Sequence, residues 1–199
     1  MLRVAMTSVM SVIVGLVCLV AGASAAGAGE RGAAAVSLTF NGEEFVHRWS
    51  QKGQHEFTPK GDEDLKTFTS MMTINVFDSV KDGEALAGIA NGVLGNYQKN
   101  GHIMRTLSKP RTANSEAEHF MAAILQAPNV REVAFARVLM FEGRGVVAVY
   151  SKRFYGEGDV PDDAMKEWFK ANAVKIERVL VSWQGIPSRA VLSALPESR

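Results

Sequence analysis

Cysteine is almost absent from this chain of 199 residues, because the only one, Cys18, lies close to the N-terminus. Once the N-terminal segment is removed, as argued below, disulfides, thiolate nucleophiles and cysteine metal sites are excluded. The sequence also lacks HExxH, G-x-S-x-G, Walker A and dinucleotide-binding motifs. These absences favour a protein without catalytic activity, and we assign no catalytic residue, no metal site and no cofactor.

An excess of charge of one sign is missing as well. The chain has 22 Lys and Arg against 21 Asp and Glu, and loss of Arg3 with the N-terminal segment leaves 21 of each. A balanced charge gives no support for binding to nucleic acid or to an anionic membrane surface. We therefore expect neither as a partner.

The only long apolar run covers about residues 9–20, after Arg3 and before the small residues Ala-Ser-Ala at 23–25. This pattern predicts a signal peptide over residues 1–25 that is cleaved before Ala26. The alternative, an uncleaved membrane anchor, needs a span of about 20 apolar residues. We therefore expect a periplasmic or secreted protein whose mature chain has no transmembrane segment.

The mature chain divides by composition into three parts. Residues 26–35 are rich in Gly and Ala and predict a flexible lead-in, residues 36–187 predict one globular domain, and residues 188–199 predict a loosely held tail. A domain of this length buries enough surface to fold without disulfides.

The segment from Arg131 to Tyr155 predicts the centre of the fold. Two runs of β-branched and aromatic residues flank the loop 142–145, which indicates a β-hairpin. The expected register pairs Phe141 with Val146, Leu139 with Ala148, Arg137 with Tyr150, and Phe135 with Lys152. Both faces of this hairpin are largely apolar, so we expect a position in mid-sheet with layers on both sides.

The remaining chain adds strands and two helices. Strands are expected near 36–40, 45–49, 67–77, 102–108 and 117–126, helices follow Asp82 and Pro161, and the polar stretch 51–65 is expected to be a loop. The order β-β-β-α-β-β-β-β-α is dominated by consecutive strands. It predicts an α+β fold with a mostly antiparallel sheet and helices packed on both of its faces.

Three side chains of the predicted hairpin are candidates for binding a ligand or a partner. Arg137, Tyr150 and Lys152 share a face with apolar residues, and burial of unpaired charge is costly. One interpretation is a set of local ion pairs whose long stems cover apolar surface. The other is a small cationic and aromatic pocket for an anionic ligand or for a carboxylate of a partner.

A second candidate surface lies on the first predicted helix. Gly88, Asn91, Gly92 and Gly95 fall opposite its apolar stripe. Interior glycines cost a helix about 1 kcal/mol each relative to alanine, and close approach of another backbone would compensate for this. The alternative is a weak, exposed helix that is held by its other face.

The histidines and a short acidic run complete the candidates. His47, His55, His102 and His119 are isolated in the sequence, so we interpret them as surface or hydrogen-bonded structural residues. The acidic residues 62–64 lack the alternating pattern of a calcium loop, and we expect them to be solvated.

The pattern of elements resembles the PsbP-like α/β sandwich superfamily. The resemblance covers about residues 36–183 and is carried by the strand and helix Thr73–Tyr97, the hairpin exit Lys152–Tyr155 and the amphipathic helix Asp162–Trp183. It implies a non-enzymatic accessory, assembly or binding role, often at a membrane complex. Together with the cationic pocket considered above, this favours an envelope protein or a small anionic ligand as partner. Two alternatives remain open: a hydrolase or isomerase with a pocket between sheet and helix and His47 or His119 as base, and a structural subunit of an envelope assembly.

Overall fold

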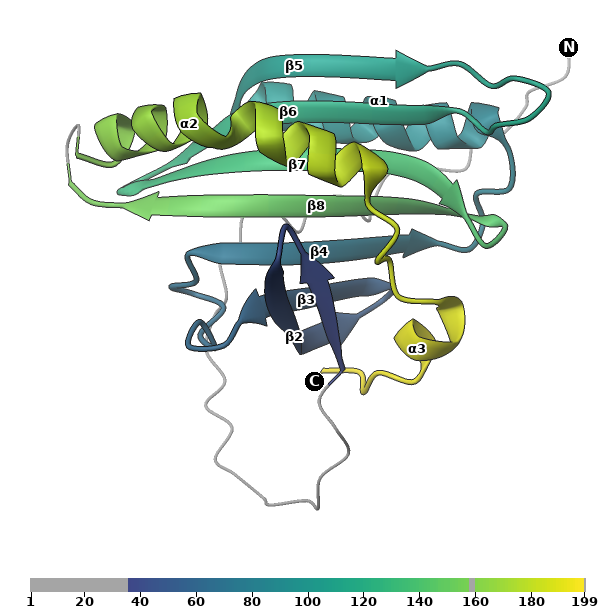
Figure 1. Ribbon diagram of the computed structural model, residues 1–199, viewed down its shortest axis with the longest axis horizontal. Coiled ribbons are helices and arrows are strands. Elements are labelled where there is room, and N and C mark those ends of the chain that lie inside the picture. Colours follow the sequence, from purple (N-terminus) through teal and green to yellow (C-terminus); the bar gives the residue numbers. More distant parts are fainter. Residues whose placement is uncertain (1–35, 158–159, 199) are drawn as a thin grey trace, which may run out of the picture.

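An eight-stranded antiparallel sheet carries the fold in the computed structural model, which describes residues 36–157 and 160–198 (Figure 1). In sequence order the strands are β1 Ser37–Phe40, β2 Glu43–Gln51, β3 Gln54–Pro59, β4 Ser70–Phe77, β5 Gly101–Lys109, β6 Glu118–Ala127, β7 Val130–Phe141 and β8 Arg144–Tyr155. The helices are α1 Gly83–Asn100, α2 Val160–Ser182 and α3 Arg189–Ser193. The strands lie in the order β1-β2-β3-β4-β8-β7-β6-β5, which confirms the predicted α+β class.

The β7–β8 hairpin lies inside the sheet, as predicted, but its register differs from the prediction by two residues. Phe141 pairs with Arg144 instead of Val146, so the turn consists of Glu142 and Gly143 alone. Both turn residues have positive φ, 49° and 71°, as a two-residue type I′ turn requires. A shift of two residues keeps every side chain on its expected face, which is why the predicted faces survive.

The stretch 51–65, expected to be a loop, instead contains strand β3. Lys52 and Gly53 form another turn with positive φ, 50° and 79°, that connects β2 with β3. The polar residues of β3 suggested exposure, yet His55, Glu56 and Thr58 are buried. Burial on both faces of the sheet, rather than residue type, sets their environment.

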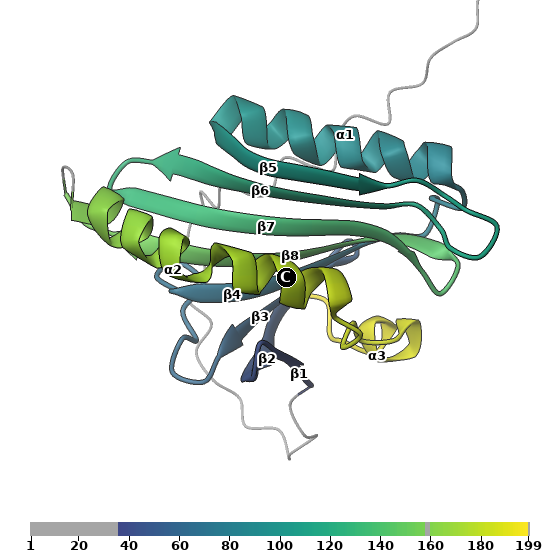
Figure 2. The same cartoon turned by 45° about the horizontal axis from the view of Figure 1, so that its top comes forward.

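The two faces of the sheet carry separate hydrophobic cores. Helix α2 packs on β7 and β8 and covers a core rich in aromatic side chains, including Phe40, Phe135 and Tyr150. Helix α1 packs on β5, β6 and β7 on the opposite face (Figure 2). The predicted covering of both faces of the hairpin is therefore present.

Small side chains allow α1 to approach its face closely. Ala123, Ala134 and Ala136 project from β6 and β7 and are fully buried beneath Leu86 and other apolar residues of the helix. The side chain of Asp82 accepts a hydrogen bond of 2.8 Å from the backbone N–H of Ala85, so Asp82 is the N-cap of the helix that was expected to follow it.

The C-terminal segment differs from the loosely held tail that was expected. Residues 189–193 form α3, and Leu192 and Leu195 join the core beneath α2. The backbone N–H of Ser198 donates to the carbonyl of Ser50 on β2 over 2.7 Å. The predicted signal peptide, 1–25, and the lead-in, 26–35, lie outside the described residues.

Candidate functional site

Arg137, the first predicted binding residue, is bonded entirely within the protein. Its guanidinium donates to both carboxylate oxygens of Glu118, each over 3.1 Å. It also donates to the backbone carbonyls of Leu180 and Trp183, over 3.3 and 2.8 Å. Arg137 thus fastens the end of α2 to the sheet, as the ion-pair interpretation expects, and its ligand-binding role stays a prediction.

Tyr150 and Lys152 lie on the same face of the sheet as Arg137. The ring of Tyr150 packs 5.1 Å from that of Phe40 and 6.4 Å from that of Phe135, and burial raises the pKa of its phenol. Lys152 donates to the hydroxyl of Ser70 over 3.2 Å. Arg137 pairs with Ala148 instead of Tyr150, so these three side chains do not form the cross-strand group that was expected.

The candidate face of α1 points away from the sheet. Gly88, Asn91 and Gly95 are exposed and Gly92 is half-buried. A methyl group added at Gly88 or at Gly95 meets no atom within 4 Å. Nothing in the described part of the chain therefore requires glycine at these two positions, and the association role stays a prediction.

We expect Gly88→Ala and Gly95→Ala each to raise the free energy of unfolding by about 0.5–1 kcal/mol, because alanine reduces the freedom of the unfolded chain and fits the open space. Gly101→Ala is the matched control at the end of the same helix. There the added methyl group meets the backbone of Ile124, so the change is expected to destabilise. Urea unfolding followed by circular dichroism measures all three. A loss of stability at Gly88 or Gly95 would show that this face is covered.

Two of the histidines share a buried hydroxyl. Ser50 lies between His47 Nε2 and His55 Nδ1, each 2.7 Å from its Oγ atom. Burial is the main cause that lowers the pKa of both imidazoles. His119 Nδ1 lies 3.0 Å from Ser108 Oγ, and His102 is exposed. Within residues 36–157 and 160–198, no three His, Cys, Asp or Glu side chains converge on a metal position.

The carboxylates of the acidic run 62–64 accept hydrogen bonds from nearby residues. One carboxylate oxygen of Asp62 accepts from the backbone N–H groups of Thr69 and Ser70 over 2.7 and 3.0 Å. Asp64 accepts from the backbone N–H of Lys66 over 2.9 Å. These contacts shape the loop that leads into β4, so the acids act as turn residues.

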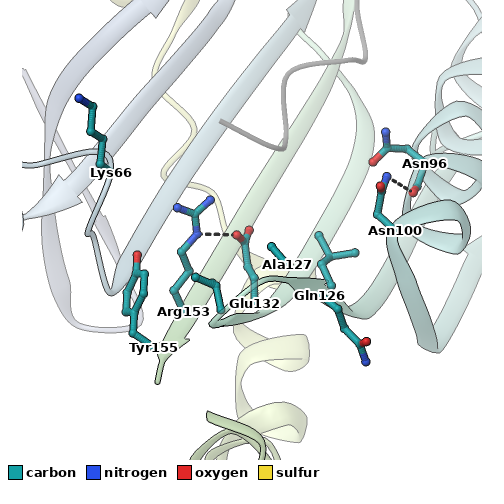
Figure 3. Close-up of a pocket in the computed structure, with 10 residues that line it drawn as sticks. Lys66, Asn96, Asn100, Gln126, Ala127, Glu132, Arg153 and Tyr155 are labelled. Atoms are coloured by element: carbon teal, nitrogen blue, oxygen red, sulfur yellow. Dashed lines mark hydrogen bonds and ion pairs between the residues drawn. The ribbon is translucent and has the colours of Figure 1, made fainter. Parts of the chain in front are cut away.

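A cavity of about 180 Å³, which we call the end pocket, opens beyond the last turn of α1 and has both polar and apolar walls (Figure 3). Helix α1, the ends of β6, β7 and β8, and the loop before β4 build its walls. The lining residues are Lys66, Asn96, Asn100, Leu125, Gln126, Ala127, Val130, Glu132, Arg153 and Tyr155. Its lining includes an ion pair between directly opposed residues of β7 and β8, Glu132 and Arg153.

The ion pair is short and largely withdrawn from water. Arg153 Nε donates to Glu132 Oε2 over 2.7 Å, and the two side chains are 14% and 9% exposed. The guanidinium also lies 4.0 Å from the centre of the Phe68 ring. Burial alone would lower the pKa of Arg153, but the nearby carboxylate of Glu132 outweighs burial and raises it. Arg153 is therefore charged at neutral pH.

Buried polar groups extend from the end pocket toward β3 and α1. Burial raises the pKa of Glu56, which interacts electrostatically with both Arg153 and Glu132. The phenol of Tyr97 is fully buried and has no hydrogen-bond partner among the described residues, and its pKa is raised by burial and by the charge of Glu132. The hydroxyl of Tyr155 donates to the carbonyl of Phe68 over 2.7 Å. Charged and unpaired groups gathered around a cavity are typical of a binding site.

Sequence reasoning missed the end pocket because of the register of the hairpin. The expected pairing of Phe135 with Lys152 placed Arg153 opposite Ala134. The observed register places Arg153 opposite Glu132, a charged pair within two covered strands. The Glu142–Gly143 dipeptide was the available signal: if it is read as a two-residue turn, the register places Glu132 opposite Arg153.

Among the described helices, none combines the length and apolar character that crossing a bilayer requires. No protein-family model matches the chain, and no curated protein matches it.

Solved structures share only a distant resemblance. The Saccharomyces cerevisiae Ran-binding protein Mog1p aligns with a TM-score of 0.41 and 9% identity over 74% of this chain and 92% of that one. A Mog1 mutant gives 0.41 and 9% over 69% and 81%. Human STARD10 aligns with a TM-score of 0.29 and 10% identity over 70% of this chain and 74% of its own chain. At these scores the resemblance carries no argument about function.

Proposed function

We propose that this chain is an exported, non-catalytic binding protein of the cell envelope, and that the end pocket is its ligand site. The Glu132–Arg153 ion pair, which lines the end pocket, carries the proposal. Its two charges are held in place before any ligand arrives, since β7 and β8 place them directly opposite each other. Pre-organised polar groups in a cavity reduce the entropic cost of binding.

Stability alone gives little reason for such an ion pair. Removing two charges from water is expensive, and a buried pair often stabilises a fold no better than apolar residues of similar size. The same strands supply apolar partners at the neighbouring buried positions, such as Val133 and Ala134. A pair of opposite charges in the wall of a cavity is therefore better explained by a polar ligand.

Export is supported by the sequence of residues 1–25, which has the order of a signal peptide. The absence of disulfides is compensated by two hydrophobic cores. The PsbP-like resemblance implies the same compartment and an accessory role. If export occurs, the protein recovered from the envelope fraction will lack residues 1–25 by mass, whereas a protein that retains them in the cytoplasm contradicts this part.

The two alternatives find less support in the site. A hydrolase or isomerase would need a base that converges with a carboxylate on a cavity. The residues that line the end pocket include Glu132 but none of the four histidines. A structural subunit would not need a cavity that is lined by an ion pair.

The proposal is tested by thermal unfolding of the purified protein, expressed as the full chain, in the presence of small polar metabolites grouped by charge. A ligand at 100 times its Kd is expected to add about 2.7 kcal/mol to the stability. In the double variant Glu132→Gln, Arg153→Gln the same ligand is expected to add nothing. Lys170→Gln, on the exposed side of α2, is the matched control and should respond as wild type does. If no group of metabolites stabilises wild type, or if all stabilise the double variant equally, the end pocket is not a ligand site.

A further inference from the structure

We infer that the end pocket takes a small zwitterion that carries both an ammonium and a carboxylate group, as a free amino acid does. This inference rests on the proposed function and names the chemical class of its ligand. It follows from the arrangement of charge across the pocket, from the hydrogen-bonding capacity left on each side, and from the size of the cavity.

Positive groups and acceptor oxygens are unevenly distributed along the pocket. In Figure 3, Lys66 and Arg153 lie on one side and Asn100 lies on the other, with Glu132 between them and paired with Arg153. The positive groups are therefore gathered at one end of the pocket, and the acceptor oxygens of Glu132 and Asn100 lie toward the other end. A ligand that places its carboxylate at the positive end and its ammonium group at the acceptor oxygens makes a favourable electrostatic interaction at both ends.

Acceptors remain available on the negative side. Glu132 Oε2 accepts from Arg153, whereas Oε1 has no hydrogen bond to any residue within the described part of the chain. Asn100 donates its Nδ2 group to the backbone carbonyl of Asn96 over 2.9 Å, which leaves its Oδ1 atom as an acceptor. An ammonium group has three donors and no acceptor, so it suits these two oxygens.

Donors remain on the positive side. A guanidinium has five N–H groups in a planar fork, and the ion pair with Glu132 uses the Nε donor. The side chain of Arg153 also interacts with the hydroxyl of Tyr155. The remaining terminal N–H groups of Arg153 can meet a carboxylate, which pairs with such a fork through two oxygens, and exposed Lys66 adds positive charge on the same side of the pocket.

A ligand with a single charge would fit less well. A carboxylate alone would draw Arg153 from Glu132 and leave a carboxylate that is 9% exposed without its full partner. An ammonium group alone would draw Glu132 away from Arg153 and leave the guanidinium without its full partner. Leaving one member of a buried pair uncompensated is strongly penalised. A zwitterion supplies a counter-charge to both members, so the pair stays neutral as a whole.

The size of the pocket sets a limit on the ligand. A cavity of about 180 Å³ accommodates a small molecule, and the side chains of Leu125, Ala127 and Val130 provide an apolar wall. An aliphatic side chain between the two charged groups would pack against this wall. The positive and negative groups of the pocket then determine the orientation of the ligand.

Calorimetric titration of the full-chain protein with L-alanine, L-valine, β-alanine, propionate and propylamine tests the inference at constant ionic strength. We expect at least one of the zwitterions to bind about tenfold or more tightly than propionate and propylamine, because each of these lacks one charge. Glu132→Gln should weaken the binding of that zwitterion by a similar factor and leave the affinity for propionate unchanged or improved. Arg153→Gln should also weaken the binding of the zwitterion and leave the affinity for propylamine unchanged or improved. Circular dichroism verifies that both variants fold.

The outcomes separate this inference from the proposed function. If propionate or propylamine binds as tightly as the zwitterions, the end pocket is still a ligand site but the zwitterion inference is wrong. The same holds if only metabolites of another class stabilise the protein in the thermal screen. If none of these compounds and none of the metabolites bind, both fail.

Discussion

Replacement of Arg137 by leucine is expected to lower the free energy of unfolding by about 3–5 kcal/mol. The guanidinium of Arg137 neutralises Glu118 and holds two carbonyl groups at the end of α2. Without it, the carboxylate loses its counter-charge and the carbonyls of Leu180 and Trp183 lose their donor in a buried place. Urea unfolding monitored by tryptophan fluorescence measures the loss.

Two further variants identify the cause of this loss. Arg178→Leu removes a cation from the exposed side of the same helix, and we expect a change within about 0.5 kcal/mol. The double variant Arg137→Leu, Glu118→Leu should recover part of the loss, because it leaves no uncompensated charge. A loss below about 1 kcal/mol for Arg137→Leu alone would show that α2 is held by its apolar contacts only.

The role of Arg137 illustrates why charge in a covered strand is ambiguous in a sequence. The same alternation that placed Arg137 on an apolar face is compatible with a ligand site and with an internal anchor. The structure supplies the missing partner from β6, 19 residues earlier, and from α2, more than 40 residues later. Local periodicity contains no information about contacts over such separations.

The fold class and the central hairpin were predictable because both depend on patterns within a few residues. Alternation of apolar side chains identified β7 and β8, and Asp82 marked the start of α1. Strand β3 was not predictable in the same way, since Glu56 and its polar neighbours are buried only because layers from elsewhere in the chain cover them. Helix α3 was missed for a related reason: its five residues are held by the tertiary contacts of Leu192.

The formation of the candidate site depended on the length of the β7–β8 turn more than on the composition of the strands. Glu142 with positive φ makes the turn two residues long, and this alone brings Glu132 opposite Arg153. The contribution of α1 to the end pocket, through Asn96 and Asn100, required the packing of the helix and could not be inferred from its sequence. The pocket is thus a product of register and packing together.

A decline in stability between pH 7 and pH 5 is the second large effect that we expect. His47 and His55 share the hydroxyl of Ser50, which can donate its proton to only one of them. Burial is the leading cause that lowers the pKa of both imidazoles below the ordinary value of 6.5, and the proximity of His47 lowers that of His55 further. Arg48 near His47, and Arg144 near His55, act in the same direction, whereas Glu197 opposes them for His55.

The direction follows from proton binding in the two states. Well above the ordinary pKa of 6.5 both histidines are neutral in the folded and in the unfolded chain, and the full stability is present. As the pH falls below this value the unfolded chain binds protons first, so stability decreases until the pH has passed the lowered pKa values of the folded state. The slope is at most about 1.4 kcal/mol per pH unit for each histidine, and half-buried His47 contributes less because solvent screens its charge.

The measurement compares urea unfolding at pH 7 and pH 5 for the wild type, His55→Gln and His102→Gln. His55→Gln should reduce the difference between the two pH values, while His102→Gln, at an exposed position, should leave it as in the wild type. Glu56 acts in the opposite direction, since its raised pKa makes its protonation at low pH stabilising. Because Glu56 is present in all three proteins, its contribution cancels in the comparison. An equal pH response in wild type and His55→Gln would mean that His55 stays accessible to protons and that the Ser50 cluster imposes no cost on its charge.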